Sequence, residues 1–65
     1  MDQRIFLGLG GNIGDVRRTF ENVLLALQRI PGISDLSRSR FFRTKAESDI
    51  EQADFLNCVV SFLTS

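Results

Sequence analysis

Two stretches of the chain show different hydrophobic periodicities, one typical of a strand and one typical of a helix. Residues 55–63 (FLNCVVSFL) are rich in strand-forming residues whose side chains point alternately to two faces, which predicts a β-strand. One face would carry Leu56, Cys58, Val60 and Phe62, and the other Phe55, Asn57, Val59, Ser61 and Leu63. Further upstream, apolar residues recur at helical spacing, which predicts an amphipathic helix. These residues are Val16, Phe20, Val23, Leu24, Leu27 and Ile30.

Local signals bound the remaining elements. We expect Asp15 to cap the helix at its N-terminus and Pro31-Gly32 to end it. Residues 4–9 (RIFLGL) form a short apolar run next to a glycine-rich turn at residues 10–14, which predicts a strand buried on both faces. Residues 33–43 favour one extended, partly exposed strand. The polar, acidic residues 44–53 predict a mobile loop.

The order strand, helix, strand, strand predicts an α+β fold. It matches the first half (β-α-β-β) of a ferredoxin-like split βαβ arrangement, with an antiparallel-containing sheet and one helix packed on one face. In that arrangement the third strand lies between the first two. A fourth strand, which these 65 residues lack, would normally close the free edge of the first strand. We therefore expect residues 1–65 to be the N-terminal part of a single domain.

The last predicted strand is apolar on both faces, but one helix covers only one face. Phe55, Val59 and Leu63 would then face water, and the strand at residues 4–9 would present an open apolar edge. Either a further part of the same domain or a second copy of the chain could provide the cover. The sequence alone leaves both alternatives open, including a homodimer through the exposed sheet face or edge.

Composition excludes several classes of protein. Eight basic and eight acidic residues cancel, so nothing argues for nucleic acid or a membrane surface as a partner, and no apolar run is long enough for a transmembrane helix. Cys58 is the only cysteine and there is no histidine, which excludes a disulfide framework and a His/Cys metal site. With no signal-peptide pattern at the start, we expect a cytoplasmic protein.

The glycine cluster first suggests a nucleotide-binding loop. The run Gly8-Leu9-Gly10-Gly11-Asn12-Ile13 has Ile at the sixth position of the dinucleotide pattern, where glycine is needed. No acidic residue follows at the distance that a ribose contact requires, and no Gly-Lys-Ser/Thr is present for a phosphate loop. A tight strand-to-helix turn fits better, and dinucleotide binding is retained only as a weaker alternative.

Three ordered motifs resemble those of the 6-hydroxymethyl-7,8-dihydropterin pyrophosphokinases. The run Gly10-Gly11-Asn12-Ile13-Gly14 is similar to the family's Gly-Ser-Asn-x-Gly, with Gly11 in place of Ser. The run Phe41-Phe42-Arg43-Thr44 is similar to Ser-x-Tyr/Phe-Arg-Thr, and residues 52–57 (QADFLN) are similar to Gln-Pro-x-Tyr/Phe-Leu-Asn. The resemblance implies a transferase of folate biosynthesis that transfers pyrophosphate from ATP to 6-hydroxymethyl-7,8-dihydropterin.

The same resemblance implies substrate contacts at three positions. Asn57 matches the asparagine whose amide reads the pyrimidine edge of the pterin, Phe55 matches the aromatic residue beside the ring, and Thr44 matches the threonine at the start of the loop. An amide offers both donors and an acceptor, which suits such a ring. A solvated Asn57 and a Phe55 that belongs to the core are the structural alternatives, and we expect Cys58 to be a core residue.

Two departures from the family affect the loop that would hold the pterin. Residues 45–48 (KAES) replace the usual Pro and a following Gly, and Ala53 replaces a common Pro. The loop conformation, and with it the grip on the pterin, can therefore differ from that of the family.

The residues that bind metal and ATP in the family have no counterpart in this sequence. The resemblance implies ATP and Mg²⁺, held by an Asp-x-Asp pair and arginines that the family places downstream of this chain's end. We therefore expect no catalytic residue, no metal ligand and no activity from this chain alone. Asp49-Ile50-Glu51 is a weak candidate for a metal site, and Arg38, Arg40 and Arg43 are either phosphate contacts or a solvated strand face. A non-catalytic, dimerising interaction module remains the alternative.

Overall fold

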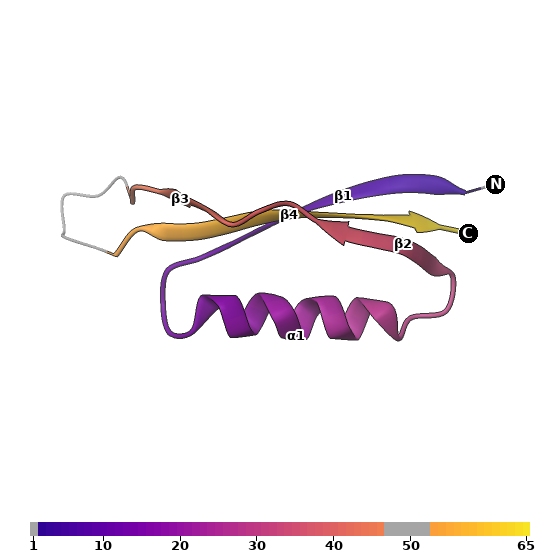
Figure 1. The fold of residues 1–65 in the computed structure, drawn as a ribbon, viewed down its shortest axis with the longest axis horizontal. Coiled ribbons are helices and arrows are strands. Elements are labelled where there is room, and N and C mark those ends of the chain that lie inside the picture. Colours follow the sequence, from indigo (N-terminus) through magenta and orange to yellow (C-terminus); the bar gives the residue numbers. More distant parts are fainter. Residues whose placement is uncertain (1, 47–52) are drawn as a thin grey trace.

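One helix and one four-stranded sheet form two layers (Figure 1). The computed structural model describes residues 2–46 and 53–65. The elements are β1 (Gln3–Gly11), α1 (Val16–Gln28), β2 (Ile33–Arg38), β3 (Phe42–Thr44) and β4 (Phe55–Thr64). The helix covers one face of the sheet, and the β3–β4 hairpin extends beyond its N-terminal end (Figure 1). This arrangement confirms the predicted α+β class.

β4 is the central strand and pairs antiparallel with the other three. β1 lies along one side of β4 in an unbroken register of nine residue pairs, from Gln3 opposite Thr64 to Gly11 opposite Leu56. β2 and β3 share the other side. The third predicted strand therefore lies between the first two, as expected, while the ferredoxin-like assignment itself remains a prediction.

The prediction of one strand over residues 33–43 is wrong. β2 ends at Arg38 and β3 begins at Phe42, with an irregular segment between them. β2 is itself interrupted, because its register against β4 shifts between Ser34 and Ser37, and Asp35 there has φ of 52°. Bulges of this kind bend an edge strand and end its regular pairing. The side of the sheet that carries β2 and β3 is therefore short and broken, unlike β1.

The helix begins as predicted and ends earlier. The Asp15 side chain accepts a hydrogen bond from the backbone N–H of Arg18 at 3.2 Å, which satisfies one of the free N-terminal donors. The last helical residue is Gln28, so Ile30 lies beyond the helix and is 47% exposed rather than part of the buried stripe. Within the helix, Phe20 is buried and forms the centre of the contact with the sheet.

The core lies between α1 and the helix-facing side of β4. Its buried members are Phe20, Leu56, Cys58, Val60 and Phe62. The four from β4 are the alternate residues that the sequence pattern placed on one face, so that prediction is confirmed. Phe41 joins the core from the segment before β3, and its ring stacks on that of Phe20 with 6.0 Å between centroids.

The prediction that β1 is buried on both faces is wrong. Phe6, on the side of β1 away from the helix, is 71% exposed, and Val59 beside it on β4 is 36% exposed. Only one helix is present among the described residues, so the second face of the sheet, here called the outer face, has no covering layer. The expectation that apolar side chains on this face would meet water is confirmed for Val59, whereas Phe55 and Leu63 are half-buried.

The connecting segments differ from the predicted turn and loop. Gly10 and Gly11 belong to β1, so the turn into α1 is shorter than expected, and it passes through Gly14 with φ of 75°. Thr44 ends β3 instead of opening a loop. Most of the predicted loop, residues 47–52, lies outside the described residues. Within the described part of the chain, no helix is long and apolar enough to span a membrane.

Candidate functional site

The side chain of Asn57 is fixed where β3 pairs with β4. Register places Asn57 opposite Phe42 and Phe55 opposite Thr44. Asn57 Nδ2 lies 3.0 Å from Thr44 Oγ1, 3.3 Å from the carbonyl oxygen of Phe42 and 3.4 Å from that of Phe55. An amide nitrogen has two hydrogens, so these three acceptors occupy its whole donor capacity. The amide is therefore held in one orientation by the strand pair.

The other end of the same amide faces β1. Gly10 is the register partner of Asn57 on β1, and a Cβ atom added at Gly10 would lie 2.9 Å from Asn57 Oδ1. A side chain at this position would push the amide out of place, because real Cβ contacts are almost never that short. None of the described residues donates a hydrogen bond to Oδ1. The oxygen is therefore available as an acceptor.

Thr44, Phe55 and Asn57 are brought together as the sequence predicted. All three lie on the outer face, since directly paired residues share a face and successive alternate residues of a strand do so too. Phe55 is half-buried, so part of its ring is accessible beside the amide. A flat aromatic surface next to an oriented acceptor suits a planar heterocycle that carries N–H donors.

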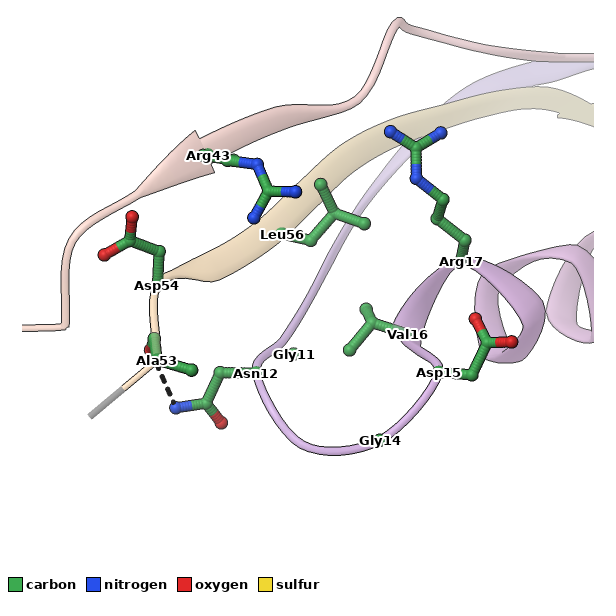
Figure 2. Close-up of a pocket in the computed structure, with 10 residues that line it drawn as sticks. All are labelled: Gly11, Asn12, Gly14, Asp15, Val16, Arg17, Arg43, Ala53, Asp54 and Leu56. Atoms are coloured by element: carbon green, nitrogen blue, oxygen red, sulfur yellow. Dashed lines mark hydrogen bonds between the residues drawn. The ribbon is translucent and has the colours of Figure 1, made fainter.

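A hollow of about 280 Å³ lies on the opposite, helix-facing side of this hairpin (Figure 2). It opens between the start of α1 and the beginning of β4. The Asn12 side chain spans it by donating a hydrogen bond to the carbonyl oxygen of Ala53 at 3.4 Å. Arg43 and Arg17 enter it from β3 and α1, respectively (Figure 2). None of the three predicted substrate residues lines this hollow, so it is separate from the Asn57 site.

Of the arginines considered as phosphate contacts, Arg43 lines the hollow and Arg38 packs against an aromatic ring. Arg38 lies over the Phe41 ring with its guanidinium carbon 4.5 Å from the centroid, and Arg17 of the helix lies 4.6 Å from the same centroid. Arg38 also donates a hydrogen bond to the carbonyl oxygen of Ser39 at 2.8 Å. Contacts of this kind stabilise packing on an aromatic face. Arg38 thus has a structural role in closing the edge of the core.

Cys58 is buried in the core. It is 1% exposed, and burial raises the pKa of its thiol, an effect that the nearby positive charge of Arg38 opposes in part. A protonated, inaccessible thiol is a weak nucleophile. Cys58 is a core residue, as the sequence predicted.

The described residues do not supply a magnesium site. No three acidic or cysteine side chains within ranges 2–46 and 53–65 lie close enough to share a metal ion. The weak candidate Asp49-Ile50-Glu51 lies outside the described residues.

Two contributors to the site were not apparent from the sequence. Gly10 gives the Asn57 amide its space, and the backbone carbonyl of Phe42 helps to hold it. Both follow from strand register, which the local pattern does not determine. The sequence feature that could have pointed to Gly10 is its position at the end of an apolar run, but there the sequence predicts a turn.

Comparison with known proteins identifies the relationship. Residues 6–65 match the model of the family described as 7,8-dihydro-6-hydroxymethylpterin-pyrophosphokinase. A protein from Methylorubrum extorquens, described as a 2-amino-4-hydroxy-6-hydroxymethyldihydropteridine pyrophosphokinase, is 39% identical over 61 residues. The aligned segment covers 94% of this chain but 39% of that relative. No solved structure gives a significant match.

The motifs, the strand register and the family match therefore agree. The three predicted motifs all fall within residues 6–65, and two of them meet in the hairpin that holds Asn57. This chain belongs to the 7,8-dihydro-6-hydroxymethylpterin-pyrophosphokinase family.

Proposed function

We propose that this chain carries the pterin-recognition part of an ATP-dependent pyrophosphokinase of folate biosynthesis. In this proposal Asn57, Phe55 and Thr44 bind 6-hydroxymethyl-7,8-dihydropterin and orient it for pyrophosphoryl transfer. The observation that carries the proposal is the Asn57 amide, whose nitrogen is engaged by Thr44 and the backbone while its oxygen is available. The family membership supports the choice of substrate.

Each residue has a distinct part in binding. Asn57 Oδ1 accepts a hydrogen bond from the N–H groups of the pyrimidine edge, which include the 2-amino group of a pterin. Phe55 supplies an apolar surface against one face of the bicyclic ring. Thr44 Oγ1 accepts from Asn57 Nδ2 and so fixes which end of the amide faces the ligand. The chain positions the substrate, and the chemistry of transfer needs ATP and Mg²⁺.

A comparison of two ligands tests the proposed hydrogen bond. Lumazine replaces the 2-amino group of pterin with an oxygen, so it removes a donor and leaves the shape almost unchanged. We expect 6-hydroxymethylpterin to bind about tenfold more tightly than 6-hydroxymethyllumazine. The 2-amino group of the pterin donates a hydrogen bond to Asn57 Oδ1, whereas the oxygen of lumazine would face Asn57 Oδ1 as a second acceptor. Titration of the ¹⁵N-labelled chain, followed by two-dimensional NMR, measures both affinities and maps the amides that shift.

Matched variants locate the site. Asn57→Ala should abolish the pterin-dependent shifts, whereas Asn22→Ala, on the exposed side of α1, should leave them as they are. Equal affinities for the two ligands would contradict the assigned hydrogen bond. If amide shifts occurred only at residues that line the hollow between Arg17 and Arg43, the ligand would bind on the helix-facing side, which would contradict the proposal.

The interaction-module alternative has no support from the comparisons. The relative and the family model both carry the name of a pyrophosphokinase.

A further inference from the structure

Gly10 lies in β1 without a conformational reason to be glycine. Among the described residues, the glycines with positive φ are Gly14 and Gly32, at 75° and 89°. Gly10 instead lies inside a regular strand, where it pairs with Asn57 in an unbroken register. Glycine inside a strand weakens it, so it often marks a bulge or a site where another group approaches closely. The pairing of β1 with β4 has no bulge, which leaves a close approach as the reason.

The close approach involves one side chain. Among the described residues, the atoms within 4 Å of a Cβ atom built at Gly10 are Asn57 Oδ1 at 2.9 Å and Asn57 Cγ at 4.0 Å. The backbone of β4 is not among them, so the fold tolerates a methyl group at this position if the amide moves. The contact joins two adjacent strands and therefore does not depend on what covers the outer face.

The Asn57 amide has little room to move aside and keep its hydrogen bonds. Its nitrogen already lies 3.0 Å from Thr44 Oγ1, which blocks a shift toward β3. Turning the amide over would set its oxygen against the carbonyl oxygens of Phe42 and Phe55, which can only accept. Rotating the side chain away from Gly10 would take the nitrogen from all three partners. Each of these movements removes Oδ1 from its present position.

We propose that Gly10 is a positioning and specificity-determining residue of the pterin site, where the lack of a side chain keeps Asn57 Oδ1 in place as an acceptor. This inference rests on the proposed function, which assigns that oxygen to the 2-amino side of the ring. Gly10 acts through Asn57, by leaving the amide oxygen its space. It thereby makes the site favour a ring edge that donates a hydrogen bond over one that accepts.

The other glycines of β1 have different surroundings. A Cβ atom at Gly8, two residues away on the same face, would have no atom of the described residues within 4 Å. A Cβ atom at Gly11, on the helix-facing side, would lie 3.3 Å from Val16 Cγ1, so that contact concerns the packing of α1. Of the three glycines, Gly10 is the one where the added carbon reaches a residue of the proposed site.

Gly10→Ala and Gly8→Ala form a matched pair, because both add one methyl group to the same face of β1. Gly8→Ala should raise the urea midpoint, since alanine loses less backbone entropy on folding than glycine. Gly10→Ala should leave the midpoint close to that of the unsubstituted chain, because the hydrogen bonds that the amide loses offset this gain. Gly8→Ala should keep the affinity for 6-hydroxymethylpterin. Gly10→Ala should lower it about tenfold, to within about twofold of the affinity for 6-hydroxymethyllumazine.

The side-chain amide of Asn57 gives a readout that needs no ligand. Its two N–H groups give separate signals in a two-dimensional ¹⁵N spectrum, and these signals report the hydrogen bonds of the nitrogen. Gly8→Ala should leave both signals where they are, whereas Gly10→Ala should move them toward the positions of a solvated amide. Thr44→Val removes one acceptor of the same nitrogen and should move the signals in the same direction.

A double substitution shows whether the amide is the group that the methyl displaces. In an Asn57→Ala background, the carbon added at Gly10 has no amide oxygen to meet. Gly10→Ala should then raise the urea midpoint by as much as Gly8→Ala does in the same background. A loss of stability there would overturn the proposal, because another part of the fold would need the glycine.

The remaining outcomes distinguish this inference from the proposed function. Unchanged Asn57 signals in Gly10→Ala, or an unchanged preference for pterin over lumazine, would overturn the role of Gly10 while pterin binding itself stands. Unfolding of Gly10→Ala would overturn it as well, since the glycine would then serve the fold. Failure of the unsubstituted chain to bind pterin would overturn the proposed function, and the specificity role with it, even if the Asn57 signals moved.

Discussion

The two faces of β4 show how one strand can have two different environments. On the helix-facing side, Cys58 and Val60 are 1% and 0% exposed, and the core has formed. On the outer face, Val59 stands between them in the sequence and is 36% exposed. The residue types are similar, so composition does not explain the difference. A second packing layer decides burial, and the described residues provide one on only one side.

The difference has a functional consequence. The helix-facing side is apolar, and the described part of it leaves no buried side-chain polar atom without a partner. The outer face combines apolar groups with the oriented amide of Asn57 and the hydroxyl of Thr44. Polar groups in fixed positions beside apolar surface are typical of ligand sites. The covered face stabilises the fold, and the outer face carries the residues to which the proposal above assigns pterin binding.

Truncation of one phenylalanine on each face should give the largest contrast. Phe20→Ala removes a 4%-exposed ring and should cost about 3–5 kcal/mol, enough to leave so small a chain largely unfolded. Phe42→Ala, on the outer face and 42% exposed, should cost about 1 kcal/mol. Urea denaturation followed by far-UV circular dichroism measures both, since the chain has no Trp or Tyr. Similar losses for the two variants would contradict the one-sided core.

An isosteric exchange at two adjacent residues sharpens the same comparison. Val60→Thr places a hydroxyl in the core without a designed partner and should cost about 1–3 kcal/mol. Val59→Thr places the same group on the outer face, where water can bind it, and should change stability by less than about 0.5 kcal/mol. Thermal unfolding of both variants at one protein concentration gives the difference. If Val59→Thr proved as costly as Val60→Thr, the outer face would have to be covered in solution.

The ion pair between Arg4 and Asp35 should have the smallest effect. Arg4 Nη2 lies 2.6 Å from Asp35 Oδ2 and joins β1 to β2 across β4, but the side chains are 37% and 65% exposed. Exposed pairs contribute about 0–1 kcal/mol, and salt reduces that further. A double-mutant cycle with Arg4→Gln and Asp35→Asn should give a coupling in this range that decreases in 1 M NaCl. A larger, salt-independent coupling would mean that the pair is shielded from solvent.

Local patterns explain most of the successful predictions. The helical spacing of apolar residues locates α1, and the acceptor side chain of Asp15 marks its start. Strict alternation along residues 55–63 assigns the buried face of β4 correctly. These features depend on neighbours within a few positions, so the sequence contains the necessary information. The motifs likewise group Thr44, Phe55 and Asn57, which the strand register then brings together in space.

Predictions that needed information from distant residues were less successful. The run at residues 4–9 has the composition of a doubly buried strand, but burial depends on what packs against it, and Phe6 remains exposed. The bulge at Asp35 and the break before Phe42 interrupt the pairing of this side of the sheet with β4. Alternation alone could not indicate either irregularity.

The sequence by itself determined the α+β class, the capped start of the helix and the face of β4 that forms the core. The reason is that side-chain periodicity is a local property of helices and strands. Only the tertiary structure decided that Gly10 lies opposite Asn57, that Thr44 Oγ1 orients the amide, and that β2 and β3 share one side of β4. Those features depend on strand register and on the number of packed layers, which join residues that are far apart along the chain.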